Sequence, residues 1–324
     1  MAAGRPVADF QILVGDALET LRGLQEASVD CCVTSPPYFG LRDYGVPGQM
    51  GLEPTPEAFV EALVQVMREV RRVLKPTGTL WLNIGDGYTS GNRGYRAPDK
   101  KNPARAMSVR PDTPEGLKPK DLIGIPWMVA FALRADGWWL RRDIIWSKPN
   151  PMPESPKDRP TTAHEYLFLL TKSPRYFYDV DAIREPAVTA SREGERRSYT
   201  PGCASSYDMG GGHQGQRGSF AGLPLNPLGR NRRSVWTIPT KPFKGAHFAT
   251  FPEGLVEPCI LAGCPEGGLV LDPFAGAGTT GVVALQEFRR FLGIEINPAY
   301  ADMAERRISA AVPGPFLFRE GTHG

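Results

Sequence analysis

A glycine-rich turn near the carboxyl end constrains the fold of this chain most. An apolar run at 268–271 predicts a short strand, and residues 279–287 have the pattern of a helix. Between them lies Asp272-Pro273-Phe274-Ala275-Gly276-Ala277-Gly278. Glycines let the backbone approach a ligand closely, and the start of the following helix presents free N–H groups. A strand, a glycine-rich turn and a helix in this order predict a nucleotide-type site within an α/β fold.

The rest of the chain alternates between predicted strands and helices. Between 56 and 74, apolar residues recur at helical spacing: Phe59, Leu63, Val66, Val70 and Val73. Strands are predicted at 10–14, 29–34, 79–84, 138–146, 166–171 and 291–296, and further helices at 17–24, 121–135, 254–262 and 298–311. Such alternation predicts a Rossmann-like, doubly wound and mostly parallel sheet with helices on both faces.

Charge is distributed unevenly along the 324 residues, although 38 basic and 35 acidic residues leave a net charge of only +3. From Arg93 to Lys120 there are eight basic and three acidic residues, and from Met209 to Pro252 six basic and no acidic residues. Both stretches are rich in Gly, Pro and Ser, which indicates basic loops. Such loops suit a polyanionic partner, and solvated surface loops are the alternative.

The cysteines indicate a reducing, cytoplasmic location and no metal site. Five are scattered along the chain without zinc-finger spacing, and no secretory segment opens the sequence. No apolar run reaches the ~18 residues of a membrane span, so we expect no membrane partner.

A second turn, Ser35-Pro36-Pro37-Tyr38, follows the predicted strand at 29–34. Two prolines fix two φ angles and remove two N–H donors, which makes a stiff loop. The loop carries a hydroxyl, unpaired carbonyls and an aromatic ring. It could hold a flat, nitrogen-bearing group by accepting its hydrogens while the ring stacks on its face. A plain Pro-Pro turn with a buried tyrosine is the structural alternative.

The glycine turn by itself leaves two cofactors open. Gly276-x-Gly278-x-x-Gly281 matches the dinucleotide fingerprint, and Glu295 ends the next strand, where a carboxylate can bind both hydroxyls of a ribose. An NAD-type oxidoreductase is therefore one reading. However, Asp272 is poorly placed beside a pyrophosphate and well placed beside the α-amino group of a sulfonium amino acid. Too little chain follows Glu295 for a dinucleotide fold unless the amino-terminal half supplies the missing strands.

Taken together, the two turns resemble those of the S-adenosylmethionine-dependent DNA amino-methyltransferases. The Pro-Pro loop precedes the glycine turn, as in the permuted β group. The similarity covers about 10–180 and 234–312, and it includes Gly15-Asp16-Ala17-Leu18, residues 143–150 and residues 247–252. It implies a circularly permuted catalytic domain whose sheet is built from both ends of the chain. The expected parts are a target-base half at 1–180 with a basic loop at 85–120, a target-recognition insert at 181–233, and a cofactor half at 234–324.

The resemblance also implies roles for individual residues. The target base is expected at Ser35, Pro36, Pro37 and Tyr38. S-adenosylmethionine is expected to lie with its ribose at Glu295 and its adenine near Asp16. Phe248 and Phe251 are expected to cover the bound cofactor. The remaining cofactor residues are Ala17, Thr34, Asp272, Pro273, Phe274, Gly276, Gly278, Thr279, Thr280 and Asn297. His164-Glu165 also fits the family pattern, although a structural role is favoured for it.

The expected activity is site-specific methylation of double-stranded DNA on a flipped base. Family members with Ser at position 35 are mostly cytosine-N4 enzymes and those with Asp mostly adenine-N6 enzymes, so Ser35 favours cytosine and leaves adenine as the alternative. Arg217, Arg230, Arg232 and Arg233 are candidates for DNA contact. A homodimer and a cognate restriction endonuclease are partners that the sequence leaves open, as it does the recognition sequence. A DNA-binding protein without transfer activity, or methylation of RNA or of a protein amide, are the remaining alternatives.

Overall fold

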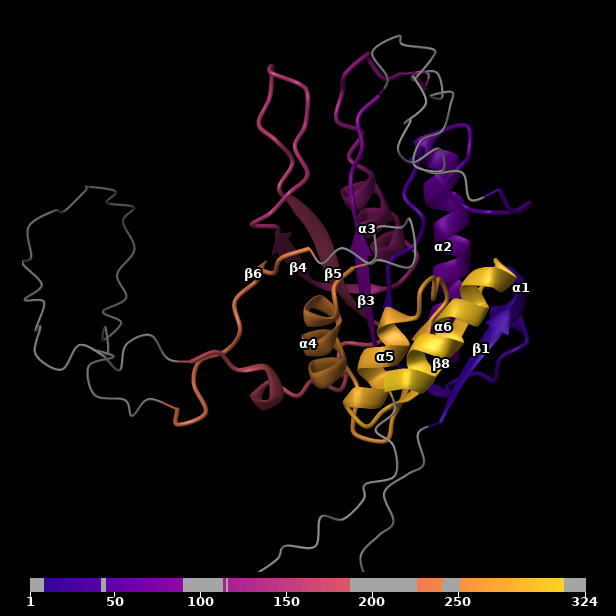
Figure 1. The fold of residues 1–324 in the computed structure, drawn as a ribbon, viewed down its shortest axis with the longest axis vertical. Coiled ribbons are helices and arrows are strands. Elements are labelled where there is room, and N and C mark those ends of the chain that lie inside the picture. The colour runs from indigo at the N-terminus through magenta and orange to yellow at the C-terminus, as the bar shows by residue number, and fades with distance from the viewer. Residues whose placement is uncertain are drawn as a thin grey trace, which may run out of the picture.

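The structure is a computed structural model that describes residues 9–41, 45–89, 113–114, 116–186, 226–240 and 251–311. Its centre is an eight-stranded sheet with the strand order β1-β8-β7-β2-β3-β5-β4-β6 (Figure 1). The strands are β1 (Phe10–Val14), β2 (Val29–Thr34), β3 (Leu74–Ile84), β4 (Trp139–Ser147), β5 (His164–Thr171), β6 (Val235–Thr237), β7 (Leu269–Asp272) and β8 (Arg290–Glu295). The helices are α1 (Ala17–Arg22), α2 (Pro56–Val73), α3 (Ile125–Ala135), α4 (Glu253–Gly263), α5 (Thr279–Gln286) and α6 (Pro298–Ala311), with a short 3-10 helix η2 (Asp181–Ile183).

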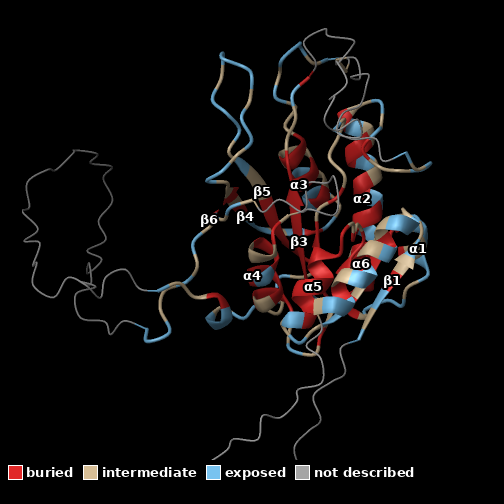
Figure 2. Ribbon diagram, in the orientation of Figure 1, coloured by how far each residue is buried: buried red, intermediate tan, exposed pale blue. Residues whose placement is uncertain are grey.

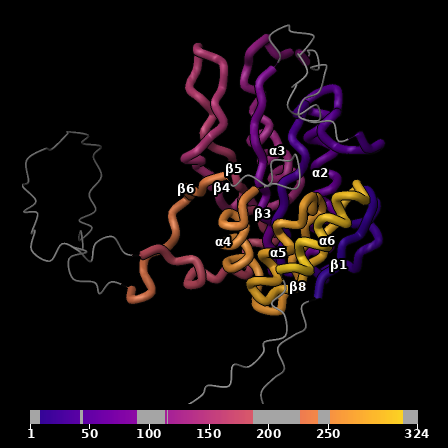
Figure 3. The backbone as a smooth tube through the Cα atoms, viewed as in Figure 1, coloured from indigo at the N-terminus to yellow at the C-terminus, as the bar shows by residue number. Residues whose placement is uncertain are grey.

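The two ends of the chain meet within this sheet. Strand β1 pairs in parallel with β8, and β7 pairs in parallel with β2. Figure 3 shows β1, from the beginning of the chain, next to β8 and α6 from its end. Only β5 runs antiparallel to its neighbours β3 and β4. The expected doubly wound, mostly parallel sheet is therefore confirmed, and so is its assembly from both ends of the chain.

In the part of the chain that the structure describes, three helices cover each face of the sheet. Helices α4, α5 and α6 pack in a row on one face, and α1, α2 and α3 pack in a row on the other (Figure 2). Neighbouring residues of one strand point to opposite faces. In β3, Trp81 accordingly belongs to the core beneath α4, whereas Leu80 and Leu82 belong to the core beneath α2. Both faces are buried, which explains why the central strands are almost continuously apolar.

Helix α2 shows how local sequence sets an element. The Thr55 hydroxyl accepts a hydrogen bond from Ala58 N, and Pro56 occupies the first turn, where its missing N–H costs nothing. The five apolar residues identified from their spacing are all buried against the sheet. The expected helix is confirmed to within one residue.

Most bounds agree within two residues, and three elements show clear differences from the sequence-based prediction. Helix α3 begins at Ile125 rather than at 121, because Gly124 has a left-handed φ of 86° and Pro126 favours the first turn of a helix. Strand β3 begins at Leu74, since the chain becomes extended directly after α2. Strand β6 was not predicted, because three residues are too few to show a period, and it forms by pairing with β4.

The division into three parts stays a prediction. The insert expected at 181–233 and the basic loop expected at 85–120 lie largely outside the described residues. Where the chain is described, no helix is long and apolar enough to cross a bilayer.

Candidate active site

The predicted site residues gather at one edge of the sheet. Strands β1, β8, β7, β2 and β3 all end there, and β5 begins there because it runs in the opposite direction. Strand β7 leads through α5 to β8 on one side, whereas β2 leads through α2 to β3 on the other. Successive strands are thus added in opposite directions across the sheet from β7 and from β2, and the point between these two parallel strands is called the reversal point. Ligands of open α/β sheets bind outside the carboxyl ends of the strands at such a point.

Asp272, at the end of β7, bridges this reversal point. Its carboxylate accepts hydrogen bonds from the Thr34 hydroxyl at 2.6 Å, the Thr280 hydroxyl at 2.6 Å and Phe274 N at 3.1 Å. Asp272 is 1% exposed, and this burial raises its pKa from 3.8 to about 6, although the three donors oppose the shift. The carboxylate therefore joins β2, β7 and α5 directly below the glycine turn.

The glycine turn has the open shape that a ligand-binding turn needs. Gly276 and Gly278 have φ angles of 50° and 74°. A Cβ atom on Gly278 would lie 2.9 Å from Ala304 Cβ, so this glycine lets the turn pack against α6. A Cβ on Gly276 would find no neighbour closer than 3.9 Å, so this part of the turn is open. The guanidinium of Arg307 donates to Ala277 O and supports the turn from α6.

Glu295 holds the other side of the turn. One carboxylate oxygen accepts from Gly276 N and the other from Asn297 N, each at 2.9 Å. Burial raises the pKa of Glu295. Its backbone carbonyl accepts from Gly15 N at 3.0 Å, which brings Asp16 and Ala17, at the start of α1, next to the end of β8. The Asp16 carboxylate caps α1 by accepting from Glu19 N at 3.0 Å.

These features fit the adenosine and amino-acid parts of S-adenosylmethionine. The open glycine backbone, the Glu295 carboxylate at the end of β8 and the first turn of α5 lie together at one strand edge. Phe251 lies directly before α4 and packs against the apolar core on that face. Phe248, its predicted partner, lies outside the described residues.

The Pro-Pro loop follows β2 on the other side of the reversal point. Pro36 is buried, and Ser35 and Tyr38 are half-buried. The Tyr38 ring lies against Gly85, where an added Cβ would come within 2.5 Å of Tyr38 Cε2. One part of the ring is thus already in contact with protein, and the predicted stacking on a base uses the remainder.

The Tyr38 hydroxyl is fixed by a polar cluster that consists of Tyr38, Asn83, Lys148 and Glu165. It donates to Glu165 Oε2 at 2.7 Å and accepts from Asn83 Nδ2 at 2.9 Å. Asn83 Nδ2 also donates to Glu165 Oε2 at 2.9 Å, and the Lys148 ammonium pairs with Glu165 Oε1. Burial, followed by the charge of Glu165, raises the pKa of Tyr38 well above its usual value. The Tyr38 hydroxyl therefore keeps its proton and donates it in a hydrogen bond to Glu165.

Sequence reasoning found only part of this cluster. Glu165 was singled out with a structural role favoured, and it does anchor the tyrosine. Lys148 lies in the stretch 143–150 that resembles the family but was given no role, and Asn83 was missed. A polar residue within the apolar run 79–84 is the signal that could have identified Asn83, because a buried polar group needs partners.

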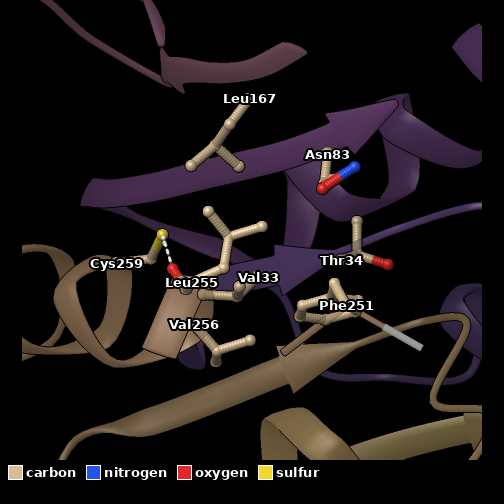
Figure 4. A pocket seen from close by; sticks show the side chains of 8 residues that line it. All are labelled: Val33, Thr34, Asn83, Leu167, Phe251, Leu255, Val256 and Cys259. Atoms are coloured by element: carbon tan, nitrogen blue, oxygen red, sulfur yellow. Dashed lines mark hydrogen bonds between the residues drawn. The ribbon is translucent and has the colours of Figure 1, made fainter. Parts of the chain in front are cut away.

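A small pocket lies between this cluster and α4. It is lined by Thr34 and Val33 of β2, Asn83 of β3, Leu167 of β5, Phe251, and Leu255, Val256 and Cys259 of α4 (Figure 4). The pocket therefore connects the strand that leads into the Pro-Pro loop with the residue predicted to cover the cofactor.

The arginines predicted to contact DNA have protein partners. The Arg230 and Arg233 guanidiniums lie 3.3 and 3.5 Å from Glu185 Oε2, and the guanidinium of Arg232 lies 4.6 Å from the centre of the Trp236 ring. Arg233 is the most exposed of the three at its side chain, with 69%. Arg217 lies outside the described residues. DNA contact stays a prediction, and Arg233 is the best placed for it.

The described part of the chain contains neither a candidate metal site nor a cysteine placed to react. No cluster of three potential ligands occurs among those residues. The described cysteines, Cys31, Cys32, Cys259 and Cys264, are buried free thiols whose pKa values are raised by burial. Such thiols are inert.

The fold and its strand edge define a Rossmann-like methyltransferase. The model of the DNA methylase family N6_N4_Mtase matches residues 29–306. The chain belongs to this family, and the expected S-adenosylmethionine cofactor is confirmed.

Relatives and solved structures agree with this assignment. The type II methyltransferase M.Cfr9I of Citrobacter freundii is 58% identical over 294 residues, which cover 91% of this chain and 86% of the relative. M.SmaI of Serratia marcescens is 51% identical over 298 residues, which cover 92% and 90%. A similar solved structure is the crystal structure of TTHA0409, a putative DNA modification methylase from Thermus thermophilus, complexed with S-adenosylmethionine. Its sequence is 29% identical to this chain, the TM-score is 0.59, and the match covers 95% of this chain and 96% of TTHA0409. The fold is also similar to that of the cytosine-N4-specific PvuII methyltransferase, with a TM-score of 0.61 and 20% sequence identity. The match covers 93% of this chain and 86% of the PvuII enzyme, and at this identity it shows a shared fold alone.

Proposed function

We propose that this DNA methyltransferase transfers its methyl group to the exocyclic N4 of a cytosine flipped out of double-stranded DNA. The observation that carries the proposal is Ser35 at the start of the Pro-Pro loop, beside the reversal point marked by Asp272. A hydroxyl stands where adenine-N6 members of the family mostly have a carboxylate. Its neighbour Pro36 has no N–H, so the loop faces a ligand mainly with acceptors.

The cofactor supplies a methyl group activated by its neutral thioether leaving group. The protein's task is therefore to position and reshape the nucleophile. The lone pair of an exocyclic amine is delocalised into the ring and must become more tetrahedral for attack. The Ser35 hydroxyl and the Pro36 carbonyl are assigned as acceptors for the two N–H groups, which favours that shape in the transition state.

The rest of the site keeps this geometry rigid. The cluster of Asn83, Lys148 and Glu165 holds the Tyr38 hydroxyl, so that the ring remains at a fixed angle beside the base. Asp272 ties Thr34, at the end of β2, to the glycine turn of the cofactor half. Fixed relative positions of the two reactants account for much of the rate in such a transfer. Flipping the base out of the duplex costs a few kcal/mol.

Nucleoside analysis tests the proposal directly. The chain is incubated with methyl-labelled S-adenosylmethionine and duplex DNA, and the product nucleosides are identified by mass spectrometry. We expect N4-methylcytosine, and we expect no label with Ser35→Ala at an unchanged melting temperature. N6-methyladenine without N4-methylcytosine would assign the alternative base. Sequencing the methylated sites in a host that expresses the chain would give the recognition sequence. A homodimer and an accompanying restriction endonuclease stay predictions.

A further inference from the structure

The side-chain oxygen of Asn83 is a buried acceptor to which no described group donates. Asn83 is 2% exposed, and its Oδ1 atom has no hydrogen-bond partner among the described residues. A buried polar atom of this kind costs about 1–3 kcal/mol in a folded protein. Such an atom in a ligand-binding site therefore points to a bound donor.

The polar cluster decides which end of the amide faces the pocket. The carboxylate oxygens of Glu165 accept from the Lys148 ammonium, the Tyr38 hydroxyl and the Asn83 side-chain nitrogen. The nitrogen of Asn83 must therefore face Glu165 and Tyr38, and the oxygen must face the other way. Figure 4 shows the oxygen end of Asn83 turned toward the pocket and the nitrogen end turned away from it. The cluster thus places the amide oxygen of Asn83, and not its nitrogen, on the side of the pocket lining.

The position of Asn83 places this acceptor beside the predicted target base. In the sheet, Thr34 is paired with Leu82, so Asn83 lies next to Ser35 at the start of the Pro-Pro loop. Asn83 also shares Tyr38 with that loop through its nitrogen. Thr34 and Phe251 line the same pocket from the cofactor side.

We infer that Asn83 Oδ1 accepts a hydrogen bond from the exocyclic amine of the flipped base and thereby helps to select a base that carries an amino group. The inference rests on the proposed function, and it adds a base-contacting residue outside the Pro-Pro loop. Oδ1 can share the two N–H groups with Ser35 and Pro36 as the amine becomes tetrahedral. A base with a carbonyl at the same position would set oxygen against oxygen and be rejected. The α-ammonium group of the cofactor is the other amino donor within the site.

A double-mutant cycle between Asn83 and the amine isolates this contact. Asn83→Leu removes Oδ1. Asn83→Asp is the matched control, because it keeps an oxygen on the pocket side and its second oxygen can hold a proton toward Glu165 in place of the amide N–H. Once the methylated site is mapped, each protein is titrated, with S-adenosylhomocysteine present, against duplexes with the natural target base and with its amine-less analogue. The analogue is pyrimidin-2-one for cytosine or purine for adenine. Easier flipping of the analogue affects all three proteins equally and cancels.

For each protein, the preference is the ratio of its affinity for the amine-bearing duplex to its affinity for the analogue duplex. We expect this ratio to be about three- to tenfold higher for wild type and for Asn83→Asp than for Asn83→Leu, which is the range of one hydrogen bond. Equal preference in wild type and Asn83→Leu would overturn the inference. A second arm measures the binding of S-adenosylhomocysteine and its deaminated analogue by calorimetry. The assignment would be overturned if Asn83→Leu weakened the preference for the cofactor amino group but left the preference for the base amine unchanged. Asn83 Oδ1 would then accept from the cofactor and not from the base. The nucleoside analysis above is independent of this cycle, since wild type can form N4-methylcytosine whether or not Asn83 contacts the amine.

Discussion

The burial of Asp272 predicts a specific dependence of stability on pH. Its pKa in the folded protein is about 6, compared with 3.8 for the free side chain, with burial as the main cause. The folded state therefore holds this proton more tightly than the unfolded state does. The resulting stabilisation is fully present below pH 3.8 and is lost as the pH rises through about 6. The difference between the two pKa values corresponds to about 3 kcal/mol.

Asp272→Asn removes this titration while keeping the shape of the side chain. An asparagine oxygen can still accept from Phe274 N, and its amide can face the Thr280 hydroxyl. We expect the stability of wild type minus that of the variant to fall by about 2 kcal/mol between pH 4 and pH 7, because only wild type must ionise a buried carboxyl and because the unfolded carboxyl is already partly ionised at pH 4. A constant offset from altered hydrogen bonds does not affect this slope.

Urea denaturation of the cofactor-free protein, followed by tryptophan fluorescence at several pH values, measures the difference. Asp302→Asn, an exposed position on α6, is the control and should run parallel to wild type. A difference between wild type and Asp272→Asn that stays constant from pH 4 to 7, or that rises with pH, would refute the reasoning. It would mean that the Thr34 and Thr280 hydroxyls outweigh the burial.

Three further changes test other parts of the site. Gly278→Ala should lower the free energy of unfolding by about 1–3 kcal/mol, since the added Cβ would lie 2.9 Å from Ala304 Cβ. Gly276→Ala should cost less in the same urea denaturation, because Gly276 shares the positive φ but its added Cβ would find no neighbour closer than 3.9 Å. Glu165→Gln leaves Lys148 without its described counter-ion, so we expect the free energy of unfolding to fall by about 3 kcal/mol. The variant also weakens the hydrogen bond that holds the Tyr38 hydroxyl, so we expect a lower kcat with a smaller change in KM. Unaltered kinetics would contradict the positioning role of Glu165. Arg233→Ala should flatten the salt dependence of DNA binding at an unchanged melting temperature, and an unchanged slope would remove this side chain from the interface.

The sequence was sufficient for the elements and for the class of protein. Regular spacing of apolar residues predicted α2 and the central strands, since burial on one or both faces leaves a period that can be counted. The Pro-Pro loop and the glycine turn were recognisable because proline and glycine restrict or free the backbone locally. The start of α3 and the strand β6 were missed because they depend on a single glycine and on pairing with a distant strand.

The polar contacts of the site were much less predictable. Asp272 was expected beside a ligand, but its carboxylate is engaged by Thr34, which lies 238 residues away in the chain. Arg230 and Arg233 lie in a stretch without acids, and yet they meet Glu185, which comes from outside that stretch. Such pairs have no local pattern, because a hydrogen bond or ion pair depends on distance in space and not on spacing along the chain.

By itself, the sequence determined most strand and helix types and the two special turns, since each follows from the chemistry of neighbouring residues, and the resemblance of those turns to a known family indicated a methyltransferase. Only the tertiary structure decided that Asn83, Lys148 and Glu165 converge on Tyr38 and that an amide oxygen faces the pocket. Those arrangements arise where strands distant in the chain end at one edge of the sheet. There, burial removes water as a partner, and each polar group must find another polar group or a ligand.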